Sequence, residues 1–187
     1  SLPRLQLAYR SGIFPWFEDG EPITWYSPAE RMVLFLEDLK VSKSLKKIID
    51  KKIFEVTFNK AFREVITNCQ NVKRSGQLGT WITDDMIHAY CNLHEAGMAK
   101  SVEVWESGEL VGGLYGIDLG HIFCGESMFS LRSNASKVAF VHLVEKLKRE
   151  NYLLLDCQVY NPHLESLGAV EIDREDFLMI LNSANKN

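Results

Sequence analysis

Two carboxylates and one amide occupy unusual positions in the sequence. Glu126 lies in "FCGESMFS", beside Met128 and Phe129, and Asp156 interrupts the apolar run "YLLLDCQVY". Gln158 follows Asp156 by two residues, so the two side chains share one face of a strand. A carboxylate beside an amide can hold an amine, accept its proton and steer a carbonyl group. These three residues are candidates for catalysis, although Glu126 also fits an edge strand that faces water.

The elements that would position these residues follow one another in the second half of the chain. The stretch "SVEVWESGELVGGLYGIDLGHIFCGESMFS" predicts three antiparallel strands with turns at 107–108 and 119–120. An amphipathic helix over 134–150 and a buried strand in "YLLLDCQVY" come next. The order β-β-β-α-β-α-β predicts an α+β fold with a mixed sheet of the acetyltransferase-like (GNAT) kind, in which the central strands part to form a slot for an acyl donor.

The 187 residues are enough for one large domain or two small ones. Helices are predicted from residue 2 to 11, from the cap Ser42 to 51, from Asn59 to 69, and from the cap Thr83 to 95.

The loop before the helix at 134–150 bears on the identity of the acyl donor. Acetyl-CoA users place a glycine-rich phosphate loop there, whereas this chain has "SLRSNAS", with no glycine to let backbone amides approach a pyrophosphate. The sequence therefore predicts a donor other than CoA.

Composition and cysteine usage exclude several classes of protein. The 187 residues are 46% hydrophobic and 25% charged, as in ordinary globular proteins, and no apolar run reaches the ~18 residues of a membrane helix. The four cysteines form no C-x-x-C pair, which argues against a zinc site and fits a reducing cytoplasm.

The charge is distributed unevenly along the chain. The net charge is −4, yet residues 40–74 contain ten Lys or Arg against three Asp or Glu. This excess can bind a polyanion, or it can form a solvated lysine-rich helix face. The loop tryptophans and tyrosine offer flat faces on which nucleic-acid bases stack, although packing is the commoner role for any one tryptophan.

Long motifs in the chain resemble one known family. "AYRSGIFPWF", "PITWYSPAERMVL", "TWITDDMIHAYCNLHEAGMAKSVEVWESGELVGGLYGI", "FCGESMFS", "NASKVAF" and "DCQVYNPHLESLGAVEI" occur in order. Together they resemble the leucyl/phenylalanyl-tRNA–protein transferases over residues 7–181. That resemblance implies transfer of Leu or Phe, and less well Met, from aminoacyl-tRNA to the N-terminal amine of proteins that begin with Arg or Lys, marking them for N-end rule degradation in the bacterial cytoplasm. It implies no metal and no ATP. It also implies two domains: a small N-terminal α/β domain, expected over 1–80, and a GNAT-like catalytic domain, expected over 81–187.

The resemblance also assigns roles to individual residues. It implies catalytic roles for Asp156, Gln158 and Glu126, and places Trp25 and Trp81 at the terminal adenosine of tRNA. The lysine cluster Lys43, Lys46, Lys47 and Lys51 is expected to contact tRNA phosphates. The expected aminoacyl pocket consists of Leu114, Met128, Ser130, Phe140, Leu143, Leu147 and Leu155.

The chain departs from the family pattern at a few positions. Tyr26 in "WYSP" replaces a second tryptophan, and Phe140 replaces a smaller aliphatic residue, which is expected to disfavour Phe as the donor side chain. The chain is expected to be trimmed at its start, to end early and to be a monomer. The alternatives are an acyl-CoA-dependent N-acetyltransferase and a non-catalytic RNA- or peptide-binding module.

Overall fold

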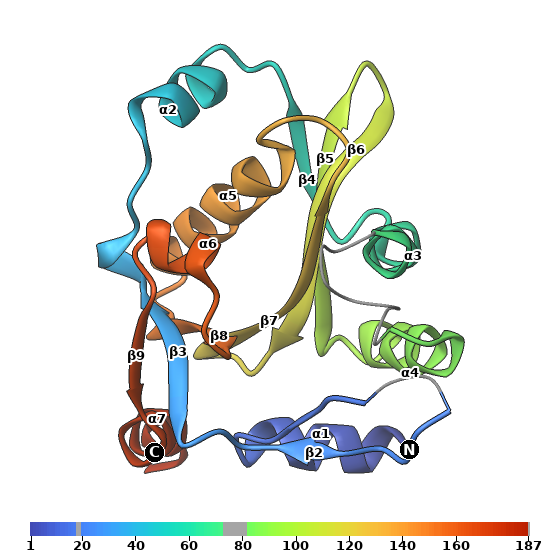
Figure 1. Ribbon diagram of the computed structural model, residues 1–187, viewed down its shortest axis with the longest axis vertical. Coiled ribbons are helices and arrows are strands. Elements are labelled where there is room, and N and C mark those ends of the chain that lie inside the picture. Colours follow the sequence, from blue (N-terminus) through green and yellow to red (C-terminus); the bar gives the residue numbers. More distant parts are fainter. Residues whose placement is uncertain (18–19, 73–81, 187) are drawn as a thin grey trace.

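The computed structural model describes residues 1–17, 20–72 and 82–186 (Figure 1). Its helices are α1 Leu2–Arg10, α2 Lys43–Asp50, α3 Phe62–Asn71, α4 Asp84–Glu95, α5 Ala135–Arg149, α6 Pro162–Ser166 and α7 Arg174–Asn182, with 3-10 turns η1 Leu36–Asp38 and η2 Ser183–Lys186. Its strands are β1 Phe14–Pro15, β2 Trp25–Tyr26, β3 Glu30–Phe35, β4 Glu55–Phe58, β5 Ala99–Glu106, β6 Glu109–Asp118, β7 Ile122–Ser130, β8 Leu154–Gln158 and β9 Val170–Asp173.

Within the described residues, seven strands form one mixed sheet in the order β4-β5-β6-β7-β8-β3-β9. The pairs are antiparallel except β7 and β8, which run parallel. The predicted α+β class and the predicted three-stranded meander are confirmed. The domain division at residue 80 stays a prediction, although β3 and β4 from the first half belong to this same sheet.

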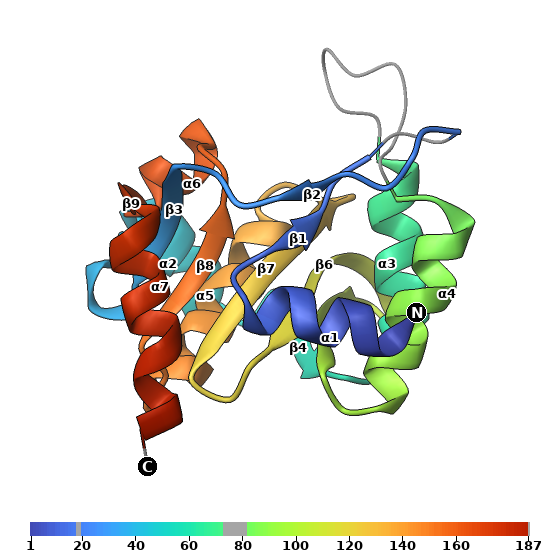
Figure 2. The same ribbon diagram turned by 90° about the horizontal axis from the view of Figure 1, so that it is seen from below.

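The two faces of the sheet are covered by different helices (Figures 1 and 2). Helix α5 packs on β5, β6 and β7 from one side, and α3 and α4 pack from the other. One apolar core lies under α5, and a second core includes buried residues of α1, α3, α4 and α7. The helix α1 therefore lies close to the strands that carry the candidate residues.

Helix caps predicted from the sequence occur where expected. The Ser42 hydroxyl oxygen accepts a hydrogen bond from the Leu45 amide, and the Thr83 hydroxyl oxygen accepts one from the Met86 amide. The predicted start of α3 was wrong, because Asn59 has a φ of 58° and its side chain accepts the Ser101 amide. The helix α3 begins at Phe62 instead.

A close approach between β6 and α5 explains why Gly112 on β6 has no side chain. A Cβ atom on Gly112 would lie 2.5 Å from the Cβ atom of Ala135. The strand β6 is also irregular here, because its register against β5 shifts after Val104. Gly112 thus lies both at a close approach of a helix and next to a bulge.

Candidate active site

The parallel strands β7 and β8 pair over only three residue pairs and then part. The last pair is Cys124 with Asp156, after which β7 continues beside β6 alone. A cavity of about 410 Å³ lies where the two strands separate, and it corresponds to the predicted slot. Its lining includes Gly125 to Met128 of β7 and Leu155, Cys157 and Gln158 of β8.

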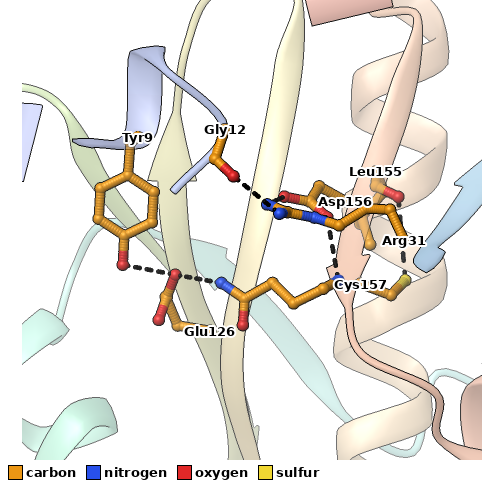
Figure 3. Close-up of polar contacts among 8 residues, drawn as sticks. Tyr9, Gly12, Arg31, Glu126, Leu155, Asp156 and Cys157 are labelled. Atoms are coloured by element: carbon orange, nitrogen blue, oxygen red, sulfur yellow. Dashed lines mark hydrogen bonds and ion pairs between the residues drawn. The ribbon is translucent and has the colours of Figure 1, made fainter. Parts of the chain in front are cut away.

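Glu126 occupies a β-bulge of β7 and lines this cavity. Tyr115 pairs with Ser127 and Gly116 pairs with Gly125, so Glu126 is the extra residue on β7. Its Oε1 atom accepts hydrogen bonds from the Tyr9 hydroxyl at 2.7 Å and from Gln158 Nε2 at 2.8 Å. Figure 3 shows Tyr9 and Glu126 facing each other.

The surroundings of the Glu126 carboxyl do not fully stabilise its negative charge. Burial raises its pKa to about 8, although the hydrogen bonds from Tyr9 and Gln158 act in the opposite direction. Its Oε2 atom is buried and has no hydrogen-bond partner among the described residues. The site therefore offers a proton acceptor whose pKa is close to the ~8 of an α-amino group.

Asp156 does not line the cavity but forms a buried ion pair behind it. Arg31 Nε lies 2.8 Å from Asp156 Oδ1, and Arg31 Nη2 lies 2.7 Å from Asp156 Oδ2. Arg31 also donates to the Gly12 carbonyl oxygen, as Figure 3 shows, and its guanidinium lies over the Phe14 and Phe177 rings. Burial lowers the pKa of Arg31, but the hydrogen bond and charge of Asp156, together with the nearby Cys124 and Glu126, raise it above its usual value. The carboxylate of Asp156 is thus occupied by protein groups.

Asp156 also holds the backbone at Gln158, which forms a tight turn at the end of β8. Gln158 has a φ of 67°, and the Val159 amide donates to the Cys157 carbonyl oxygen at 2.9 Å. This is a γ-turn with positive φ, a rare and strained conformation. The Gln158 amide donates to Asp156 Oδ1 at 2.9 Å. Asp156 and Gln158 therefore do not present their side chains together to the cavity, contrary to the expected shared strand face.

Most of the predicted aminoacyl pocket lines the apolar part of the cavity. Five predicted residues line it: Leu114, Met128, Phe140, Leu143 and Leu155. Ser130 and Leu147 do not. The Ser130 hydroxyl is used at the start of α5, where it donates to the Arg132 carbonyl and accepts the Ser136 amide, and Leu147 is buried in the core under α5.

The contacts with nucleic acid stay predictions, and the structure shows where most of these residues lie. Trp25 packs against the core that includes α1, whereas Trp16 lines the cavity and tilts against Tyr26 at a ring distance of 5.4 Å. Trp81 lies outside the described residues. The predicted lysines Lys43, Lys46, Lys47 and Lys51 are all exposed on or beside α2.

Several residues at the site were not predicted from the sequence. Tyr9, Tyr90 and Arg31 reach it from α1, α4 and β3, and they lie 81 to 125 positions from their partners in the chain. The run "AYRSGIFPWF" contains Tyr9 and Trp16, so its aromatic residues were the available signal.

Three backbone amides in and beside the loop between β7 and α5 already donate hydrogen bonds within the protein. The Leu131 amide donates to the Val111 carbonyl, the Ala135 amide to the Arg132 carbonyl, and the Ser136 amide to the Ser130 hydroxyl. These three amides are therefore not free to bind a phosphate group. None of the described helices is long and apolar enough to cross a membrane.

Comparison with known proteins identifies the family. The model for the leucyl/phenylalanyl-tRNA protein transferase family matches residues 33–182, and the model for its N-terminal domain matches residues 1–29. The leucyl/phenylalanyl-tRNA--protein transferase of Flavobacterium johnsoniae is 68% identical over 180 residues, which cover 96% of this chain and 85% of that protein. The protein of the same name in Flavobacterium psychrophilum is 64% identical, with 97% and 86% covered.

A solved structure shows a similar fold. FemX superimposes with a TM-score of 0.56 over 91% of this chain and 66% of that chain, at 12% identity. This identity supports a shared fold and nothing further. The two family models together extend over nearly the whole chain, and the chain therefore belongs to the leucyl/phenylalanyl-tRNA protein transferase family and is an aminoacyltransferase.

Proposed function

We propose that the protein transfers Leu or Phe, and less well Met, from aminoacyl-tRNA to the N-terminal α-amine of proteins that begin with Arg or Lys. The products would be substrates of N-end rule degradation in the cytoplasm, and the enzyme would act as a monomer. The observation that carries the proposal is a cavity lined both by apolar side chains and by Glu126, whose Oε2 atom has no hydrogen-bond partner among the described residues. An apolar acyl side chain fits against the apolar lining, and a cationic amine fits beside the carboxyl group.

The reaction needs orientation and proton transfer more than chemical energy. The bond to tRNA is an ester and the product is an amide, so the transfer runs downhill without ATP. Glu126 takes the proton of the α-ammonium, because the two groups have similar pKa values and a shared proton leaves part of the amine neutral. Gln158 orients the reactants beside Glu126, and Asp156 holds Gln158 through the backbone.

The remaining parts of aminoacyl-tRNA have candidate partners around the cavity. Trp16 is 39% exposed and lines the cavity, so the terminal adenine is expected to stack on it. The exposed lysines of α2 would contact phosphates without reading sequence. Discrimination between close apolar side chains is worth only ~1–3 kcal/mol, so overlap among Leu, Phe and Met is expected.

The direct test is transfer of radiolabelled leucine from Leu-tRNA to a protein that begins with Arg. The control acceptor is the same protein beginning with Ala. Label on the Arg protein alone supports donor, acceptor and reaction together. Label on neither protein, from a folded enzyme, contradicts the proposal. Retention on immobilised CoA would favour an N-acetyltransferase instead.

A further inference from the structure

Two tyrosine hydroxyls connect Glu126 to helices outside the sheet. Tyr9 belongs to α1 and Tyr90 belongs to α4, and both side chains are buried. The Tyr9 hydroxyl donates to Glu126 Oε1 at 2.7 Å and is also hydrogen-bonded to the Tyr90 hydroxyl. The rings of the two tyrosines meet edge to face, which fixes their relative orientation.

The direction of this hydrogen-bond chain follows from counting protons. A tyrosine hydroxyl has one proton to donate, and Tyr9 donates its proton to Glu126. Tyr90 must therefore be the donor in its bond with Tyr9. Burial raises the pKa of both tyrosines well above the usual range, so both hydroxyls keep their protons. The chain runs from Tyr90 to Tyr9 to Glu126, and each donor strengthens the next.

The two carboxyl oxygens of Glu126 differ in the hydrogen bonds that they accept. Oε1 accepts from both Tyr9 and Gln158, whereas Oε2 is buried without a partner among the described residues. A proton on Oε2 leaves both bonds to Oε1 intact, since a protonated carboxyl still accepts through its other oxygen. A proton on Oε1 would displace one of the two donors.

We propose that Tyr9 and Tyr90 are positioning residues of the transfer reaction, which direct the proton of the acceptor amine to Oε2 of Glu126. This inference rests on the proposed function. In the step, an N–H bond of the α-ammonium breaks, its electron pair stays on nitrogen, and an O–H bond forms on Oε2. The product is a neutral amine beside a neutral carboxyl. The amine then attacks the ester carbonyl carbon and forms the C–N bond, while the C–O bond to the tRNA ribose breaks. The nitrogen gives up its second proton, and the leaving ribose oxygen takes up one proton and departs as a hydroxyl.

Other polar groups also influence the pKa of the Glu126 carboxyl, so a test must leave these residues unchanged. They are Arg31 from β3, Cys124 from β7, and Asp156 and Gln158 from β8. A suitable control changes a tyrosine that bonds a different carboxylate. Tyr152 meets this need, because its hydroxyl donates to Asp118 at 2.7 Å and it does not line the cavity.

The experiment follows the side-chain carboxyl carbon of Glu126 by NMR during a pH titration of the folded, substrate-free protein. Tyr9→Phe removes a donor that favours the anion, so the midpoint should rise by about one pH unit. Tyr90→Phe should raise it by less, and Tyr152→Phe should leave it unchanged. The pH optimum of leucine transfer should move upward in the first two variants.

Ring-fluorinated tyrosine at position 9 provides a second variant that keeps the packing. Its hydroxyl is a stronger donor, so the midpoint should fall. Unchanged midpoints in the Tyr9→Phe and fluorinated proteins, with transfer reduced equally at every pH, would overturn the proposal. Because the midpoint is measured without substrate, it does not depend on transfer. Failure of the wild-type protein to label an Arg-starting acceptor would instead contradict the proposed function.

Discussion

Arg31 and Asp156 form a bidentate ion pair that is 1% and 0% exposed, directly behind the cavity. The pair joins β3 to β8 across the sheet and, through the Gly12 carbonyl, ties both strands to the end of α1. Because Asp156 Oδ1 also accepts the Gln158 amide, the ion pair supports the strained turn that places Gln158 beside Glu126. Asp156 thus acts through other residues in this account.

Removal of Arg31 should destabilise the fold strongly. Arg31→Met leaves Asp156 as a buried charge without its partner, which typically costs ~3–5 kcal/mol. Urea unfolding measures this loss. The control is Arg132→Met, since the Arg132–Glu106 pair is largely exposed and should contribute less than ~1 kcal/mol. Equal, small losses in both variants would contradict a structural role for the Arg31–Asp156 pair.

Replacement of Asp156 separates positioning from proton transfer. Asp156→Asn should reduce kcat by more than about tenfold, because the side-chain NH2 group cannot accept from Arg31. The ion pair that holds the turn at Gln158 is then lost. The pH optimum should stay in place, since Asp156 is not the proton acceptor in this account. Asp118→Asn is the control, because Asp118 also accepts a backbone amide, but its partners are Gly120 and Tyr152 and not Gln158. A near-normal rate would exclude the role, and a shifted optimum would make Asp156 the base.

The raised pKa of Glu126 predicts a specific pH dependence of stability. The folded protein holds this proton up to about pH 8, whereas the unfolded chain releases it near 4.5, so the free energy of unfolding falls as pH rises between these values. Glu126→Gln should therefore be more stable than wild type at pH 9, by at least about 1 kcal/mol, and the difference should shrink toward pH 5. Urea unfolding at both pH values tests this. A difference independent of pH would contradict the raised pKa.

Phe140 should limit the size of the donor side chain. Phe140→Leu enlarges the cavity, so kcat/KM for Phe-tRNA should rise relative to Leu-tRNA by roughly tenfold. Phe62→Leu makes the same change in the core that includes α3 and should leave this ratio unaltered. An unaltered ratio in the Phe140 variant would place the donor side chain elsewhere.

The sequence predicted local structure well because local signals determine it. Ser42 and Thr83 cap helices through bonds to residues three positions later, and such bonds are visible in a linear pattern. Asn59 shows the limit: its side chain bonds Ser101 across the sheet instead of capping the next helix. The separation of β7 from β8 was expected from strand order, and the apolar cavity residues followed from the resemblance.

The polar network was predicted only in part because its contacts are long-range. Glu126 and Gln158 were identified and do meet, but the partners Tyr9 and Arg31 lie more than a hundred residues away along the chain. The positive φ of Gln158 turns its side chain away from the strand pattern that the sequence suggested. The resemblance assigned the adenosine contact to Trp25 and Trp81, and it gave no such role to Trp16, which lines the cavity.

The most direct measurement is transfer of labelled leucine from Leu-tRNA to a peptide that begins with Arg, by wild type and Glu126→Gln at pH 8. The N-acetylated form of the same peptide is the control acceptor. We expect label on the free peptide alone. In Glu126→Gln the transfer rate should fall by about a hundredfold, the range expected for removal of a general base. Transfer by Glu126→Gln at the wild-type rate would contradict the role of Glu126 as the acceptor of the amine proton.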